Sequence, residues 1–79
     1  MKMIREEAQV LVMFDKRNAS PILLTSTQGT FRVNRTIKAW KERRNLRDCF
    51  IYLCQIEGRS DPLELRWETE SNSWFIEKL

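Results

Sequence analysis

The chain contains no histidine, so the most common catalytic base and metal ligand is missing. Ser-His-Asp, Cys-His and metal–histidine chemistries are therefore excluded. The two glycines stand alone at expected turns, so there is no glycine-rich phosphate loop. Carboxylates cluster near the end of the chain without a neighbouring titratable partner: Glu64, Glu68, Glu70 and Glu77. We therefore expect no enzymatic activity and no cofactor.

Cysteine is scarce, with only Cys49 and Cys54, five positions apart in one predicted strand. At that spacing the side chains point to opposite faces and stand roughly 16 Å apart. A disulfide requires Cα atoms within about 7 Å, so no intrachain bridge is expected. Without histidine the two thiols cannot complete a zinc site, and we expect both to be small buried hydrophobic residues.

Long hydrophobic runs are also lacking. The longest apolar stretches, residues 10–14 and 49–54, are far shorter than the roughly 20 residues that span a bilayer. Residues 1–7 show no secretory signal and are expected to be frayed. The 79 residues fit a single domain, 1–79, that we expect in the cytoplasm, without a membrane partner.

What the sequence does have is apolar alternation interrupted by turn residues. It predicts six short strands, at residues 8–14, 22–26, 30–35, 49–56, 63–69 and 74–78. The last two strands should turn Leu63, Leu65, Trp67, Trp74 and Ile76 inward. Tight turns between strands imply an antiparallel meander. The prediction is a mostly β (α+β) fold, a curled sheet or partly open small barrel. Its terminal strands would be exposed edges unless they pair.

The period changes at Thr36. Ile37 and Trp40 are three positions apart among lysines and arginines, which predicts a short amphipathic helix of about two turns ending at Asn45. Asn34 or Thr36 would cap it. So short a helix needs Ile37 and Trp40 docked on the sheet, between the third and fourth strands.

Basic residues are concentrated in the same segment, although the net charge is only +3. Seven fall between positions 32 and 47: Arg32, Arg35, Lys38, Lys41, Arg43, Arg44 and Arg47. This pattern is typical of a surface that contacts nucleic-acid phosphates. An acidic protein partner is an alternative, and so is a solvated helix face with no dedicated site.

A second class of function rests on Phe75. This residue shares a strand face with Glu77 and Leu79, so it should be exposed unless the helix or another chain covers it. Phe75 and Leu79, beside an edge strand, would then form a protein-interaction surface or a homodimer contact. Trp40, Trp67 and Trp74 are expected in the core.

A series of landmarks runs through most of residues 8–79: Pro21 before an apolar strand, Gly29-Thr30-Phe31-Arg32-Val33 after it, Trp40 in the basic helix, an aromatic strand around Tyr52, Leu63-Glu64-Leu65-Arg66 and a closing Trp74. Their order resembles a small bacterial domain family of unknown function, also found appended to proteins related to lesion-bypass polymerases. Thr30-Phe31 depart from the pattern, where Arg and Tyr would be typical. The resemblance implies an accessory domain in a nucleic-acid-associated setting and assigns no catalytic residue.

Overall fold

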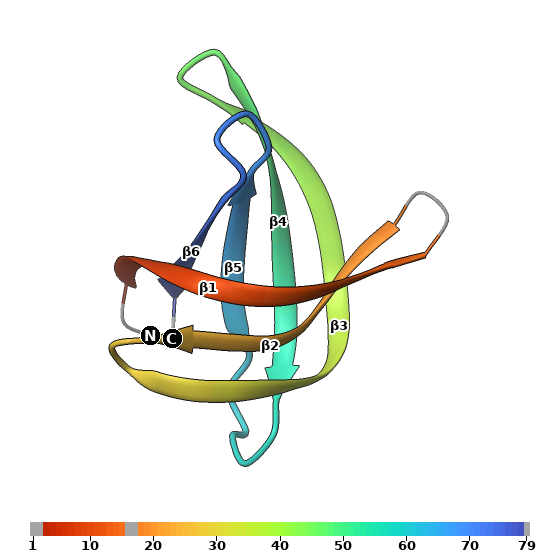
Figure 1. Ribbon diagram of the computed structural model, residues 1–79, viewed down its shortest axis with the longest axis vertical. Helices are drawn as coiled ribbons and strands as arrows, with labels where there is room; N and C mark the ends of the chain where they lie inside the picture. The colour runs from red at the N-terminus through yellow and green to blue at the C-terminus, as the bar shows by residue number, and fades with distance from the viewer. Residues whose placement is uncertain (1–2, 16–17, 79) are drawn as a thin grey trace.

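The structure, a computed structural model, describes residues 3–15 and 18–78, which form six β-strands. They are β1 (Met3–Asp15), β2 (Asn18–Ser26), β3 (Gly29–Arg44), β4 (Arg47–Ile56), β5 (Leu63–Glu68) and β6 (Ser73–Lys78). Each strand pairs antiparallel with the next, and β6 pairs with β1, so the sheet closes into a barrel (Figure 1).

The predicted fold class is wrong in two respects. The described residues contain no helix, because β3 continues as a strand through the segment expected to be helical. The barrel is closed rather than partly open, because the first and last strands pair with each other instead of forming edges. The fold is therefore all-β. Among the described segments there is accordingly no helix that could cross a membrane.

Two long strands close the barrel by bending. The first part of β1, from Met3 to Ala8, pairs with β6, and its second part pairs with β2. Likewise, β3 pairs first with β2 and then, from Val33 onward, with β4. One sheet of β1, β2 and the start of β3 thus crosses over a second sheet of β4, β5, β6 and the rest of β3 (Figure 1).

Two β-bulges explain why the basic segment has a helix-like pattern. Asn34 and Ile37 are extra residues on β3 that have no partner on β4. A bulge shifts the alternation of side chains by one position and bends the strand. The bulge at Ile37 breaks the two-residue alternation, so the three-residue spacing of Ile37 and Trp40 occurs in a strand and not in a helix. Ile37 is 43% exposed and is not docked on the sheet as predicted.

The core lies between the two sheets. Its fully buried side chains include Leu24, Ile56, Leu63, Leu65 and Ile76. The inward orientation predicted for Leu63, Leu65, Trp74 and Ile76 is confirmed. The first strand, however, begins at Met3 rather than at Ala8, so the described part of the N-terminus belongs to the barrel.

Both cysteines are free and buried, as predicted. In β4 they occupy positions of opposite parity, so Cys54 points to the core and Cys49 to the other side of the sheet. Burial raises the pKa of the Cys54 thiol to about 11 and also raises the pKa of Cys49. Both thiols stay protonated near neutral pH, so neither is an activated nucleophile.

Candidate functional site

The seven basic residues of the sequence do not form one surface. Cross-strand partners in an antiparallel ladder lie on the same side of the sheet. Lys41 and Arg43 pair with Phe50 and Asp48, on the inner side that faces the barrel interior. Lys38, Arg44 and Arg47 lie at alternate positions of the same hairpin and belong to the outer side, which also carries Ile51, Arg66 and Phe75.

On the outer side the arginines are held by carboxylates. Arg44 contacts Glu42 at 2.9 Å and Glu77 at 2.6 Å. Arg66 pairs with Glu68 and lies 3.2 Å from Glu77. We call the set formed by Arg44, Arg47, Arg66, Glu42, Glu68, Glu70 and Glu77 the outer ion-pair layer. Its four carboxylates outnumber its three arginines, so this side offers no net positive charge to a phosphate.

This layer also encloses groups that the sequence placed at the surface. Glu77 is only 2% exposed, because the side chains of Arg44 and Arg66 cover it. Burial lowers the pKa of Arg44, but its hydrogen bonds to Glu42 and Glu77 and the charge of these carboxylates outweigh burial, so the net shift is upward. Arg44 therefore serves as a structural cation.

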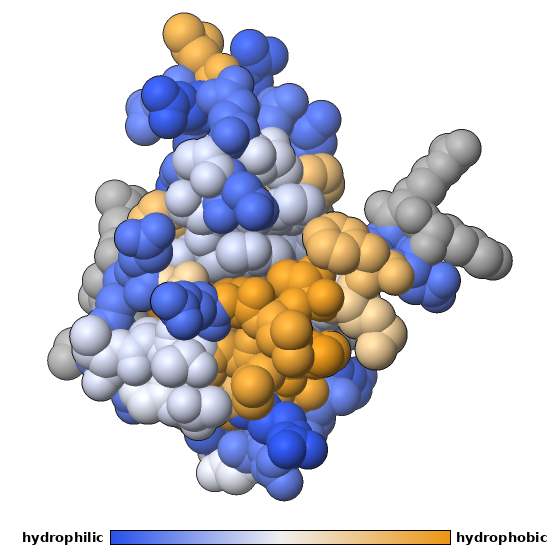
Figure 2. Space-filling model, viewed as in Figure 1, coloured by the Kyte–Doolittle hydropathy of each residue, from blue (hydrophilic) through white to orange (hydrophobic). Residues whose placement is uncertain are grey.

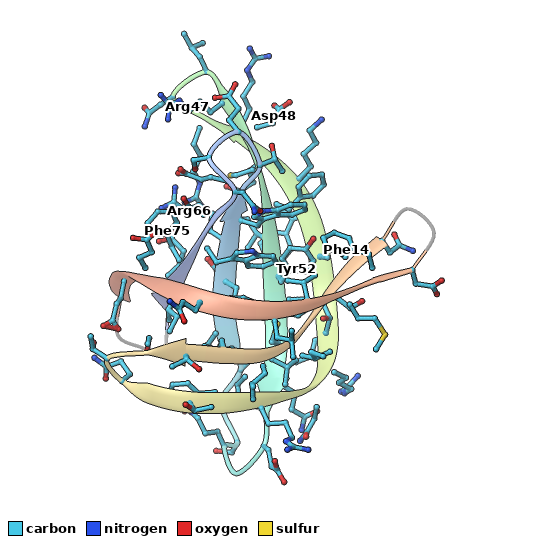
Figure 3. The ribbon with its side chains drawn as sticks, viewed as in Figure 1. Phe14, Arg47, Asp48, Tyr52, Arg66 and Phe75 are labelled. Carbon is cyan, nitrogen blue, oxygen red and sulfur yellow. The ribbon has the colours of Figure 1, made fainter. Side chains whose placement is uncertain are left out.

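Aromatic side chains of the outer side are tied to the same groups. Trp40 is half-buried and donates its indole N–H to Glu42 at 2.6 Å, while the ammonium of Lys38 lies 5.5 Å from its ring. Phe75, expected to be exposed unless the helix or another chain covers it, is half-buried under the guanidinium of Arg66 at 4.5 Å (Figure 3). Its proposed partner in a protein interface, Leu79, lies outside the described residues.

The remaining two basic residues sit near the bend of β3. Arg32 is exposed and pairs with Glu57 at 3.5 Å, and Arg35 donates to the side chain of Gln55 at 2.9 Å. Both residues lie far from the β3–β4 turn along the strand. They therefore do not form a continuous basic surface with Lys41 and Arg43.

The inner side of the hairpin opens into a cavity of about 300 Å³ lined by aromatic rings. We call it the aromatic mouth; its aromatic lining includes Phe14, Phe50, Tyr52 and Trp67. It lies between the β1–β2 hairpin and the upper part of strands β3, β4 and β5 (Figure 3). Phe14 is 68% exposed, so a flat ligand can reach the rings from solvent.

Three rings of the mouth form one connected aromatic cluster. The centroid of Trp67 lies 5.8 Å from that of Phe50 and 6.4 Å, edge-on, from that of Phe14. Behind it, Trp67 stacks on the buried Trp74 at 5.3 Å with an interplanar angle of 6°. Trp67 also donates its indole N–H to Asn72 at 3.1 Å. The surface is therefore preorganised for stacking.

Two cations lie on the same side of the hairpin as these rings. Lys41 lines the mouth and pairs with Asp48 at 3.5 Å, both side chains being at least half exposed. Such an exposed pair is weak, so a ligand phosphate can replace Asp48. Arg43 lies two residues further on the same side and makes no ion pair with any described residue. The inner side thus combines stacking surface with available positive charge.

Sequence reasoning found the cations of this site but missed its rings. Phe14 and Phe50 were assigned only to strands, and Trp67 was assigned to the core, whereas it is half-buried and lines the mouth. Phe14 belongs to the first hairpin and Trp67 to the fifth strand, so only the closed barrel brings them together. Phe14, at the end of the first apolar run and next to a polar loop, was the one residue whose position in the sequence indicated an accessible ring.

Three of the acidic residues near the end of the chain are paired with arginines. Glu68 and Glu77 bind arginines of the outer ion-pair layer, and Glu70 lies 3.7 Å from Arg47. Among the residues the structure describes, no group of three metal-ligating side chains comes together. No known protein family, characterised protein or solved structure matches the chain. The resemblance to a bacterial domain family therefore stays a prediction.

Proposed function

We propose that this domain is a non-enzymatic module that binds single-stranded nucleic acid at the aromatic mouth. The observation that carries the proposal is the placement of Lys41 and Arg43 on the same side of β3 as the rings of Phe50 and Trp67. Proteins that bind single strands combine stacking aromatics with nearby cations that track the backbone. In duplex nucleic acid the bases are already stacked on one another, so this site favours unpaired bases.

The volume and exposure of the site support an open surface rather than an enclosed ligand pocket. About 300 Å³ lies at the low end for cavities that bury a small molecule. A single strand needs less enclosure, because each base presents a ring face and its phosphate stays in water. Tyr52 forms part of the buried lining, and burial raises the pKa of its hydroxyl, so this residue stays neutral.

The test is fluorescence anisotropy with a labelled single-stranded oligonucleotide of about ten nucleotides, the size range of small single-strand sites. The full chain should bind at low salt and lose affinity as salt rises, with a slope of about −0.7 per phosphate contacted. No binding at tens of micromolar protein and low salt would refute the proposal.

A matched pair of variants locates the site. Phe50→Leu removes a half-buried ring from the mouth, and Phe75→Leu removes a ring that is also half-buried, from the outer side. We expect Phe50→Leu to weaken binding about tenfold, since base–aromatic stacking is worth about 1–3 kcal/mol per base. Phe75→Leu should leave affinity unchanged. Equal losses in both variants would place the binding elsewhere.

A second candidate function is a protein contact through the outer face of β1 and β2. Leu11 and Met13 are each 57% exposed, and apolar side chains gather over these two strands (Figure 2). Exposed apolar patches of this kind mark interaction surfaces. Light scattering at two concentrations, compared with Leu11→Ser, tests for self-association through this face.

We also propose a cytoplasmic location, because both cysteines are free thiols.

A further inference from the structure

The turn between β3 and β4 presents an apolar side chain that the fold itself does not require. Asn45 has a φ of 51° and Leu46 a φ of 65°, so both central residues adopt the left-handed conformation of a two-residue type I′ turn. Asparagine and glycine accept this conformation, whereas a leucine is strained in it. Local backbone preference therefore does not explain Leu46.

Burial does not explain Leu46 either. Its exposed fraction is 85%, higher than the 68% of Phe14. Its neighbours are hydrophilic: Arg43, Arg44 and Asn45 precede it, and Arg47 and Asp48 follow. Figure 2 shows the upper end of the molecule, where the β3–β4 turn lies, as largely hydrophilic. Strained residues that persist without a packing role point to a contact with a partner.

The position of Leu46 relative to the aromatic mouth suggests what that contact is. Lys41, at the mouth, lies three residues before Arg44, where β3 ends, which is roughly 10 Å along the strand, and Leu46 lies in the turn that follows. Arg43 lies between them, on the side of the mouth. A single strand of nucleic acid that stacks on Phe50 and Trp67 and continues along Lys41 and Arg43 therefore reaches Leu46.

We propose that Leu46 is an apolar wedge that packs on the terminal base pair where a duplex meets the single strand held at the mouth. This inference rests on the proposed function and narrows its ligand to a junction between single-stranded and duplex nucleic acid. Leucine is among the apolar side chains that proteins place against base steps. An exposed duplex end offers the same flat apolar surface without any cost of unstacking, and Arg43, on the side of the mouth, is the cation that can contact its phosphates.

Anisotropy with three labelled oligonucleotides tests the wedge: a single strand, a blunt duplex, and a duplex that carries the same single strand as an overhang. The full chain should bind the junction about tenfold more tightly than the single strand, because Leu46 adds an apolar contact with the terminal base pair. Leu46→Asn keeps a residue that accepts a positive φ but removes the apolar side chain. It should retain single-strand affinity and lose the preference for the junction.

Thermal melting of Leu46→Asn and Leu46→Gly provides the control for folding. Both should melt at or above the temperature of the native chain, because the strain at this position is relieved. Equal affinity of the native chain for single strand and junction would overturn the wedge and leave the proposed function standing, as would a preference that survives in Leu46→Asn. Absence of binding to all three oligonucleotides would overturn both.

Discussion

On the inner side of the β3–β4 hairpin, Lys41 lines the aromatic mouth and pairs with Asp48, and Arg43 follows on the same side without an ion pair to any residue that the structure describes. On the outer side, Arg44 and Arg47 are matched by Glu42, Glu77 and Glu70 in the outer ion-pair layer. The two sets alternate along the same ribbon. Strand parity therefore sorts the cations into a pair that a ligand can use and a group that holds the outer surface together.

The comparison shows why a count of charges does not locate a binding site. The seven basic residues are close together in the sequence, but on a bulged strand their side chains point to both sides of the sheet. The residues that matter for binding are then those whose charge is least compensated.

The largest effect is expected from Glu77→Ala, which would disrupt the outer side. Glu77 is 2% exposed and contacts both Arg44 and Arg66, so its removal leaves two partly buried guanidinium groups without this carboxylate. We expect the free energy of unfolding in urea to fall by about 3 kcal/mol. Glu70→Ala, which removes a carboxylate that is 69% exposed beside Arg47, is the control and should change stability little.

A second prediction concerns the inner side of β4, where Cys54 lies in the core. Its pKa of about 11 exceeds the value of 9.0 for an unperturbed thiol, so above pH 9 the unfolded chain loses this proton before the folded chain does. The folded state then binds more protons, and stability falls as pH rises. With about 1.4 kcal/mol per pKa unit, the loss between pH 9 and 11 should reach about 2–3 kcal/mol.

Cys54→Val isolates this contribution, because valine is apolar and does not titrate. The free energy of unfolding in urea is measured for both proteins at pH 8 and pH 11. Subtracting the change in Cys54→Val from the change in the native chain cancels the titration of lysines and tyrosine, which both proteins share. If the two proteins lost the same stability over this pH range, the Cys54 thiol would not be desolvated as the structure describes it.

The third prediction compares two exposed arginines near the β3–β4 turn, Arg43 on the inner side of the sheet and Arg47 on the outer side. Arg43→Glu should weaken single-strand binding about tenfold, since a charge-assisted contact to a phosphate is replaced by repulsion. Arg47→Glu carries the same change of charge on the outer side and should alter affinity less than about twofold. Equal losses in anisotropy titrations would show that net charge alone drives binding.

Local pattern was sufficient for those parts of the fold that depend on near neighbours in the sequence. Alternation identified the inward side of the last two strands, and the spacing of Cys49 and Cys54 placed the thiols on opposite faces. It failed where a bulge breaks the alternation, because the shift at Ile37 mimics the three-residue spacing of a helix.

Pairing between strands far apart in the sequence was the other feature that local pattern could not predict. Closure requires β1 to pair with β6 across nearly the whole chain, and no local pattern specifies that pairing. The aromatic mouth depends on the same closure, since Phe14 and Trp67 meet only in the finished barrel. Likewise Glu77 had an outward position in the alternation, and its burial needs arginines from β3 and β5.

The smallest effect is expected at Phe75, where the structure and the predicted protein interface lead to different results. If the ring serves mainly to support the guanidinium of Arg66, 4.5 Å away, Phe75→Leu should lower the free energy of unfolding by about 1 kcal/mol through loss of the cation–π contact. The molar mass measured by light scattering should stay that of the native chain. A change in mass with unchanged stability would instead assign Phe75 to a contact between chains, and the outer side would then carry a binding surface of its own.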